Sequence, residues 1–152
     1  MPRAISRVRI GVVNGPKLNR LGDREPQHYG HHTLAEIEEM LRGRAERRSI
    51  QIEFMQSDDE DAIVTWLNEH ALQVDGWLVN AAILTHSSAV LRDALVSTGL
   101  PFVELHLSNV FAREPFRRQS MLAEQAVGVI AGFRENSYFL ALDALADHLE
   151  GL

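Results

Sequence analysis

Apolar and polar positions along the chain follow two alternating patterns. Short apolar runs, some with polar residues at every second position, are typical of strands, and they fall at residues 8–13, 50–54, 76–79, 102–105 and 126–131. Between and after them lie stretches whose apolar residues recur at helical spacing, at residues 33–45, 58–71, 87–98 and 136–149. This order predicts βαβ units, in which consecutive strands run parallel.

The predicted helices carry recognisable end signals. Residues 33–36 have the pattern of a capping box, and the apolar residues that follow share one helical face: Leu34, Ile37, Leu41 and Ala45. Acidic residues 58–61 fall in the first turn of the next helix, where the helix macrodipole favours negative charge. Gly99 and Pro101 end the helix that begins near Ser87.

Five strands joined by right-handed crossovers place helices on both faces of the sheet. We therefore expect an α/β fold, a flavodoxin-like three-layer sandwich with a five-stranded parallel sheet. The 152 residues contain no internal repeat, low-complexity tract or linker. The chain is therefore expected to form a single domain, residues 1–152.

The composition narrows the classes of function. Lys and Arg number 15 and Asp and Glu 21, so the net charge is −6, which argues against a broad surface for nucleic acid or an anionic membrane. There is no cysteine and therefore no disulfide framework. Nowhere do about eighteen apolar residues run together, as a membrane-spanning helix requires. We expect a cytoplasmic protein.

Polar side chains follow most of the predicted strands, directly where each strand ends. They are Asn14, Gln56 with Ser57, Asn80, and residues 106–109, which read His-Leu-Ser-Asn. In open parallel sheets, ligands bind beyond the carboxyl ends of the strands. This edge of the sheet is therefore the expected site.

A long loop follows the first strand, and residues 17–30 of it are expected to form a lid. Long loops inside compact domains are usually lids or binding segments, and this one carries Lys17, Arg24 and Tyr29. A tyrosine can act as a general base when neighbouring guanidinium groups stabilise its phenolate. Arg24 is close in sequence, and Arg113 could approach from the loop after the fourth strand. Alternatively, Tyr29 only anchors the lid to the core.

Glu104 and His106 are two residues apart on the fourth strand, so their side chains point to the same side. A carboxylate bonded to one imidazole nitrogen fixes the tautomer and makes the other nitrogen a better proton carrier. The alternative is a pair at the sheet edge without a catalytic role.

Backbone N–H groups near the same edge could bind an anion. Residues 80–88 lead into a helix start, with Asn80 and His86 as polar neighbours, and Ser108 with Asn109 follows the fourth strand. The simpler interpretation is helix capping by Ser87 and a turn at Ser108.

The remaining charged residues allow two interpretations. Arg113, Arg117 and Arg118 form a basic cluster that is either a solvated face or part of the site. Asp93 lies beside Arg92 and could form only an exposed ion pair of little energetic value. Glycine-rich phosphate loops are absent from the sequence, and His31-His32 lacks a partner at metal-ligand spacing, so we expect neither a cofactor nor a metal.

Together these segments resemble the type II 3-dehydroquinate dehydratases, or type II dehydroquinases, over about residues 8–145. The resemblance rests on Asn14-Gly15-Pro16, Leu21-Gly22, Arg24-Glu25-Pro26, Tyr29-Gly30, Gln56-Ser57, Asn80, Thr85-His86 with Ser88, Arg92-Asp93-Ala94, residues 104–109, Ala112-Arg113-Glu114, Phe116-Arg117 and Tyr138.

The resemblance implies a flavodoxin-like subunit in a dodecamer of four trimers. It also implies anti elimination of water from 3-dehydroquinate, giving 3-dehydroshikimate through an enolate without a Schiff base or cofactor, in the shikimate pathway or in quinate breakdown. By resemblance, Tyr29 removes a C2 proton, assisted by Arg24 with Arg113 nearby. His106, oriented by Glu104, then protonates the departing C1 hydroxyl.

The resemblance also assigns the residues that hold the substrate. The backbone N–H groups of Leu107 and Ser108 would hold its carboxylate together with Asn80. His86 and Arg117 would contact ring hydroxyls. Asp93 would reach in from a neighbouring subunit.

Several residues depart from the family pattern. Lys17 stands where the family usually has asparagine, although a lysine could still stabilise negative charge. Residues 81–83 read Ala-Ala-Ile in place of a glycine-containing stretch, and Arg134 replaces a glycine, as do Asp61 and Ser137; Asp58 replaces an asparagine. These departures leave open a relative with altered or lost turnover that binds a quinate-like cyclic carboxylate. A flavin- or nucleotide-binding module is the third hypothesis and rests on fold analogy alone.

Overall fold

The structure is a computed structural model that describes residues 7–23 and 25–151. Its described residues form one sheet of five parallel strands in the order β2-β1-β3-β4-β5. The strands are β1 (Val8–Asn14), β2 (Ile50–Gln56), β3 (Gly76–Asn80), β4 (Phe102–His106) and β5 (Gly128–Ala131). This arrangement confirms the predicted α/β fold with a five-stranded parallel sheet.

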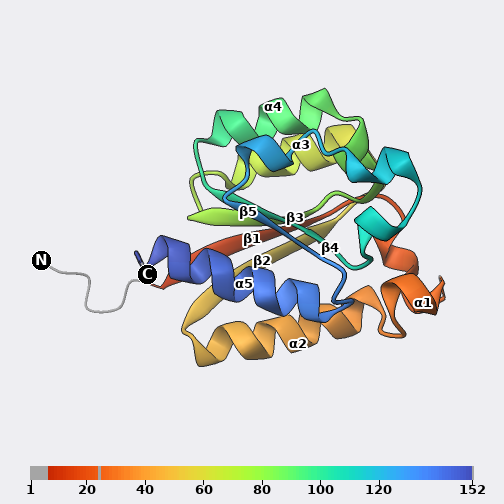
Figure 1. The fold of residues 1–152 in the computed structure, drawn as a ribbon. Helices are drawn as coiled ribbons and strands as arrows, with labels where there is room; N and C mark the ends of the chain where they lie inside the picture. The colour runs from red at the N-terminus through yellow and green to blue at the C-terminus, as the bar shows by residue number, and fades with distance from the viewer. Residues whose placement is uncertain (1–6, 24, 152) are drawn as a thin grey trace, which may run out of the picture.

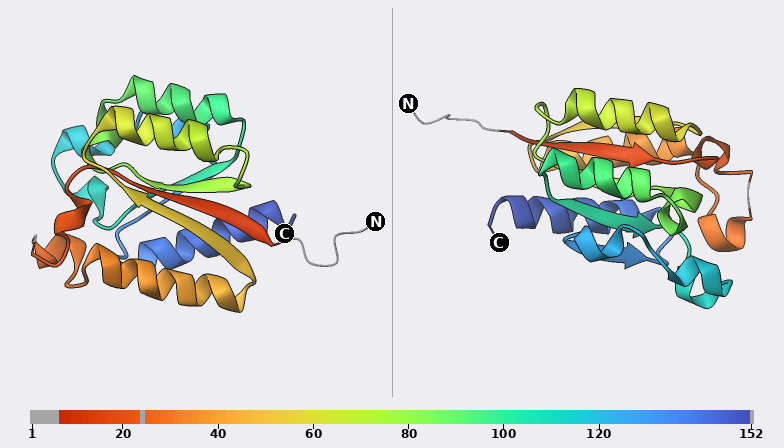
Figure 2. Two further views of the ribbon diagram at one scale, coloured as in Figure 1. Left: turned by 180° about the vertical axis from the view of Figure 1, so that it is seen from behind. Right: turned by 90° about the horizontal axis from the view of Figure 1, so that it is seen from above.

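Helices cover both faces of the sheet and complete the three layers (Figures 1 and 2). On one face lie α2 (Leu34–Arg47) and α5 (Asn136–Leu149); on the other lie α3 (Glu60–His70) and α4 (Ala89–Thr98). Each layer interface is apolar: Ile37 and Leu142 belong to the core on the first face, and Ile63 and Leu95 to the core on the second.

The start of α2 follows the predicted capping box. Thr33 accepts the N–H of Glu36, and the Glu36 side chain accepts the N–H of Thr33. The predicted apolar face is buried in full: Leu34, Ile37, Leu41 and Ala45. Two of the four orphan N–H groups at the helix start are thereby satisfied locally.

Two other helix starts differ from the prediction. The cap of α4 is Ser88, whose hydroxyl accepts the N–H of Leu91, while Ser87 follows a 3₁₀ turn, η2 (Ala82–His86). Ser88 is favoured because its hydroxyl also donates to Glu60 of α3 over 2.5 Å. In α3 the cap is Asp59, so Asp58 lies outside the helix.

The strand at the far edge is shorter than predicted. β5 begins at Gly128, and residues 126 and 127 connect it to a 3₁₀ turn, η5 (Ala123–Gln125). The last helix, α5, begins at Asn136 as predicted, with Leu142 and Leu145 fully buried and Phe139 and Leu149 partly buried against the core.

The predicted lid contains two short helical turns, η1 (Leu18–Arg20) and α1 (Pro26–Tyr29). Leu18 and Leu21 are buried and fix the loop to the core. Arg24 lies outside the described residues. In Figure 1, α1 lies at the same end of the molecule as the segments that follow β4, which include η3 (Val110–Ala112) and η4 (Pro115–Arg118).

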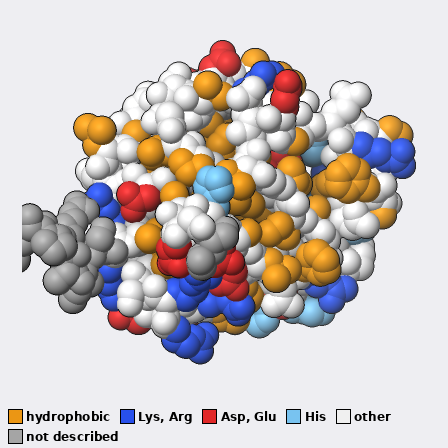
Figure 3. Space-filling model, turned by 60° about the vertical axis from the view of Figure 1, so that its left-hand side comes forward, with side chains coloured by type: hydrophobic (Ala, Val, Ile, Leu, Met, Phe, Trp, Pro, Cys, Tyr) orange, Lys and Arg blue, Asp and Glu red, His pale blue; other side chains and the backbone are white. Residues whose placement is uncertain are grey.

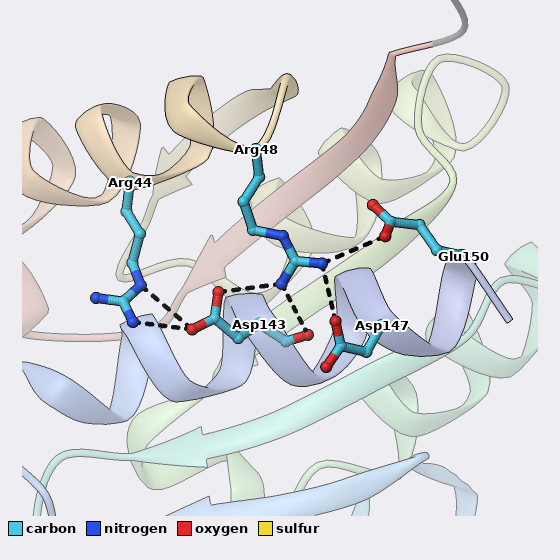
Figure 4. Close-up of polar contacts among 5 residues, drawn as sticks. All are labelled: Arg44, Arg48, Asp143, Asp147 and Glu150. Atoms are coloured by element: carbon cyan, nitrogen blue, oxygen red, sulfur yellow. Dashed lines mark hydrogen bonds and ion pairs between the residues drawn. The ribbon is translucent and has the colours of Figure 1, made fainter. Parts of the chain in front are cut away.

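A charged network joins α2 to α5 (Figure 4). Arg48 contacts Asp143 at 3.2 Å, Asp147 at 2.8 Å and Glu150 at 3.4 Å, and Arg44 contacts Asp143 at 2.9 Å. The hydrogen bond to Asp147 raises the pKa of Arg48. Figure 3 shows acidic and basic side chains next to one another on the face near the chain ends. The network ties two helices far apart in sequence onto one face of the sheet.

Within the described residues, no helix is long and apolar enough to cross a lipid bilayer.

Candidate active site

The register of the sheet aligns three amide side chains at its carboxyl edge. Asn14 at the end of β1 lies opposite Gln56 of β2 on one side and opposite Asn80 of β3 on the other. Because parallel strands end at the same edge, this row marks the edge at which the site was predicted. Asn80 is the member of the row that lines a cavity there. Gly15 follows directly, and a Cβ there would lie 2.3 Å from the carbonyl oxygen of Ala81, so only glycine permits this close approach.

A buried tyrosine connects two members of this row. The Tyr138 hydroxyl donates to Oδ1 of Asn14 over 2.5 Å and accepts from Nδ2 of Asn80 over 2.9 Å. Burial raises the pKa of the Tyr138 phenol, so it stays protonated and keeps its donor. Tyr138 therefore fixes the orientation of the Asn80 amide, although the sequence had marked it only as part of a motif.

Glu104 and His106 form the pair predicted from their spacing on β4. Nε2 of His106 lies 2.5 Å from Oε2 of Glu104, and both residues are buried. The other carboxylate oxygen, Oε1, accepts the hydroxyl proton of Ser120 over 2.6 Å. The pair is thus part of a buried hydrogen-bonded chain and is not an exposed pair at the sheet edge.

Tyr29 and Arg113 meet across 84 residues of sequence. Nη1 of Arg113 donates to the Tyr29 oxygen over 2.8 Å and to the Ser108 hydroxyl over 3.2 Å. The guanidinium carbon also lies 5.3 Å from the centre of the Tyr29 ring, and the Arg113 side chain is only 8% exposed. The contact places a buried guanidinium group at the phenol oxygen, the atom that would accept a proton if Tyr29 acts as a base.

His86 and Arg117 stand at the same cavity. The His86 ring lies nearly parallel to that of His106, with centres 6.2 Å apart, and its Nδ1 lies 2.8 Å from the carbonyl oxygen of Gln119. Arg117 pairs with Glu114, and this hydrogen bond lowers the pKa of the Glu114 carboxyl.

These side chains line one cavity of about 220 Å³. Most of the predicted site residues reach it: Lys17, Tyr29, Asn80, His86, His106, Leu107, Ser108, Arg113 and Arg117. Glu104 lies behind His106. Asp93 is exposed on α4 and is not part of the cavity wall. Arg24 falls outside the residues that the structure describes.

Two contributors to the site, Gln119 and Ser120, were not predicted from the sequence. Both lie in irregular backbone after η4, where no periodicity or motif marks a side chain as inward-facing. Among residues 7–23 and 25–151, no cluster of three or more His, Asp or Glu could hold a metal ion.

The family model for dehydroquinase class II matches residues 8–146. This chain belongs to the class II dehydroquinase family. Among its relatives, a 3-dehydroquinate dehydratase of Synechococcus sp. strain WH7803 is 49% identical over 145 residues, which cover 95% of this chain and 99% of that protein. One from Parasynechococcus marenigrum strain WH8102 is 51% identical over 138 residues, covering 91% and 94%.

Solved dehydroquinases share the fold over nearly their whole length. The type II dehydroquinase from Butyrivibrio crossotus DSM 2876 has a TM-score of 0.90 to this chain at 35% identity, covering 93% of this chain and 99% of its own. The enzyme from Propionibacterium acnes has a TM-score of 0.87 at 36% identity, with the same coverage. The resemblance inferred from sequence motifs is thereby confirmed.

The residues that depart from the dehydroquinase pattern can now be placed. Lys17 lines the cavity with its backbone in the left-handed region (φ 67°), and its N–H donates to Asp58 over 2.8 Å. This bond, followed by one from Gln56, holds the pKa of the Asp58 carboxyl below its ordinary value. Ile83 is 48% exposed, so it stands at the cavity wall without filling the interior.

Two departures fall where the backbone favours glycine. Ala82 has φ 55° and Arg134 has φ 51°, a region in which a Cβ is strained. Both residues therefore carry a side chain at a position whose backbone conformation favours glycine.

Proposed function

We propose that this chain is a hydro-lyase that dehydrates 3-dehydroquinate to 3-dehydroshikimate, the activity for which its cyanobacterial relatives are named. The observation that carries the proposal is the pairing of Tyr29 with Arg113 and of His106 with Glu104 at one cavity. Tyr29 with Arg113 is suited to act as a general base, and His106 with Glu104 is suited to act as a general acid. An elimination of water requires both.

The reaction begins with proton removal. The Tyr29 phenolate takes a proton from C2 of the substrate, and the electrons pass into an enolate. Arg113, in contact with the phenol oxygen, stabilises the negative charge before the transfer. By family resemblance Arg24 shares this task.

Loss of water completes the reaction. Nε2 of His106 is engaged by Glu104, so Nδ1 is the nitrogen left to donate a proton to the C1 hydroxyl. The C1–O bond breaks as water leaves, and the enolate electrons form the C1–C2 double bond. A carboxylate behind the ring stabilises the imidazolium that acts as the acid.

The other cavity residues hold the substrate. Asn80, held by Tyr138, binds the substrate carboxylate together with backbone N–H groups of Leu107 and Ser108. His86 and Arg117 contact the ring hydroxyls, and Lys17 adds positive charge at the cavity wall.

We also propose that the chain acts as a homo-oligomer, a dodecamer of four trimers. Asp93 is exposed on α4 and absent from the wall of its own cavity, which is consistent with a role in the cavity of a neighbouring subunit.

The test is to add 3-dehydroquinate to the purified protein and follow the ultraviolet absorbance of the conjugated product. Turnover is expected in the parent, and Tyr29→Phe and His106→Ala should each lose on the order of a hundredfold or more in kcat, since each removes a proton-transfer group. His148→Ala, an exposed position near the end of α5, is the control and should keep the parent rate.

Two outcomes would contradict these assignments. A flat trace in the parent, with binding still detected by calorimetry, would favour the second hypothesis, a relative that binds a cyclic carboxylate without dehydrating it. Parent-like rates in Tyr29→Phe or His106→Ala would refute the corresponding role.

A further inference from the structure

Ser120 lies directly behind the Glu104–His106 pair, in the segment between η4 and η5. Its hydroxyl is 2.6 Å from Oε1 of Glu104, whose other oxygen is 2.5 Å from Nε2 of His106. Glu104 and His106 are both buried, and buried polar groups need hydrogen-bond partners. Ser120 is the third member of a hydrogen-bonded chain that ends at the cavity.

Counting donors fixes the direction of the bond between Ser120 and Glu104. A serine hydroxyl has one proton and two lone pairs. The lone pairs of Ser120 accept the N–H groups of Leu122 and Ala123, each over 3.0 Å, so its single proton is directed to Glu104. The other oxygen of Glu104 lies 2.5 Å from Nε2 of His106. Glu104 therefore engages Nε2 and leaves Nδ1 to exchange a proton at the cavity.

The segment that carries Ser120 is itself anchored beside the second histidine. The N–H of Met121 donates to the carbonyl oxygen of Thr85 over 2.8 Å. One residue before Ser120, the carbonyl oxygen of Gln119 lies 2.8 Å from Nδ1 of His86. Residues 119–121 therefore contact His86 directly and His106 through Glu104. The two histidine rings are inclined by only 13°.

We propose that Ser120 is a positioning residue: its hydroxyl keeps Glu104 turned toward Nε2 of His106, which keeps Nδ1 of His106 available for proton transfer. Ser120 is not part of the cavity wall, so it acts through Glu104 and not on the substrate. The kinetic consequence rests on the proposed function, whereas the tautomer of His106 is measurable without turnover.

The kinetic test compares Ser120→Ala with the parent. Its kcat for 3-dehydroquinate should fall roughly tenfold to a hundredfold, because the loss of a hydrogen bond to a charged group usually costs a free energy of that size. KM should change little. Ser120→Thr keeps the hydroxyl and should recover most of the rate. An unchanged kcat in Ser120→Ala would overturn the proposal.

Ser88 provides a matched control. Its hydroxyl also donates to a glutamate, Glu60, over 2.5 Å and accepts a backbone N–H, that of Leu91, over 2.9 Å. Ser88→Ala therefore removes similar bonds away from Glu104. It should lower the melting temperature and leave kcat unchanged, which separates loss of stability from loss of positioning.

A double-mutant cycle tests the route of action. If Ser120 acts through Glu104, adding Ser120→Ala to Glu104→Gln should change kcat by less than about twofold, because interacting residues are not additive. If the loss of kcat in the double variant equals the product of the two single losses, Ser120 does not act through Glu104, and the proposal is overturned.

Nitrogen-15 spectra of histidine-labelled protein read the tautomer directly, with His106→Gln to assign the signals. The parent should show His106 protonated at Nε2, and Ser120→Ala should move both ring signals toward mixed tautomers, while Ser88→Ala leaves them in place. If the parent fails to turn over 3-dehydroquinate but Ser120→Ala moves the signals, the proposed function fails and the positioning role stands. Unmoved signals would overturn the positioning role whatever the activity.

Discussion

Lys17 combines a fixed backbone with a side chain at the cavity. Its N–H donates to Asp58, which also accepts from Nε2 of Gln56 over 3.0 Å. These bonds hold the backbone turn, and the Lys17 ammonium group takes no part in them. Its left-handed backbone is one that asparagine, the usual residue of the family, adopts more readily than lysine. A contribution of the Lys17 ammonium charge to binding or turnover would explain why lysine occupies a position whose backbone conformation disfavours it.

Lys17→Asn should therefore lower kcat/KM by about fivefold, roughly the effect of one exposed charge on an anionic transition state. Lys17→Met is the matched neutral variant of similar length and should lose as much, whereas Lys17→Arg should lose less. The measurement is steady-state kinetics at low and high salt, since screening should narrow the difference between parent and variant. Higher activity in Lys17→Asn would contradict a contribution from the charge.

Arg134 gives a test of backbone strain. Its φ of 51° lies in the left-handed region and its side chain is exposed. Arg134→Gly should raise the free energy of unfolding by about 0.5–1 kcal/mol, the relief of strain less the added freedom of the unfolded chain. Chemical denaturation measures the change. Arg134→Ala removes the guanidinium but keeps the strain, so an equal gain in that variant would assign the effect to charge.

At the scale of the elements, Tyr138 links α5 to the ends of β1 and β3. Its hydroxyl satisfies Asn14 and Asn80, both buried, across 124 and 58 residues of sequence. The contact joins the helical layer to Asn80, which lines the cavity. Tyr138 is therefore expected to contribute both to stability and to the proposed substrate binding by Asn80.

Tyr138→Phe should lower the free energy of unfolding by about 1–3 kcal/mol, because two buried amides each lose a partner. KM should rise more than kcat falls, since the freed Asn80 is a proposed binding group. Burial raises the folded-state pKa of Tyr138, so its contribution is complete below the unfolded pKa of roughly 10 and is lost as the pH rises toward the folded value. Denaturation at pH 7 and above pH 10 should show the difference between parent and variant shrinking.

The elements and the local pairs were predictable because their causes are local. Short apolar runs marked the strands, with period-two alternation at residues 50–54. The Thr33–Glu36 pattern gave the start of α2, and spacing alone put Glu104 beside His106. The choice of Ser88 over Ser87 as the cap of α4 was not predictable, because it is decided by contact with Glu60 on another helix.

The residues that position the proposed catalytic side chains were harder to predict than those side chains themselves. Ser120 reaches Glu104 from an irregular segment that carries no period. The contact of Arg113 with Tyr29 was one of two open possibilities, because chain folding over 84 residues decides it.

At the scale of the whole molecule, an apolar surface lies along the edge strand β5. Phe111, Val129, Phe133 and Leu140 are each at least 40% exposed and line one shallow hollow. Exposed apolar patches at a sheet edge commonly mark protein interfaces. This surface supports the proposed homo-oligomer, whose size sedimentation velocity would measure.

Subunit mixing tests whether Asp93 serves a neighbouring cavity. Asp93→Asn and Tyr29→Phe should each be nearly inactive alone as pure assemblies. In co-expressed mixed assemblies, a site works when its own subunit keeps Tyr29 and the neighbour that contributes Asp93 keeps that residue. Random mixing of equal amounts in a symmetric assembly should restore about a quarter of the parent activity per site.

The control for this experiment is Tyr29→Phe mixed with His106→Ala. Both residues belong to the same cavity wall, so no mixture of these subunits can rebuild a complete site, and the activity should stay near zero. If the Asp93→Asn mixture also stays inactive, although mass spectrometry shows mixed assemblies, Asp93 does not act across the subunit boundary. Restored activity would instead make the assembly part of the catalytic unit, because each cavity would then need a residue that its own chain places on an outer helix.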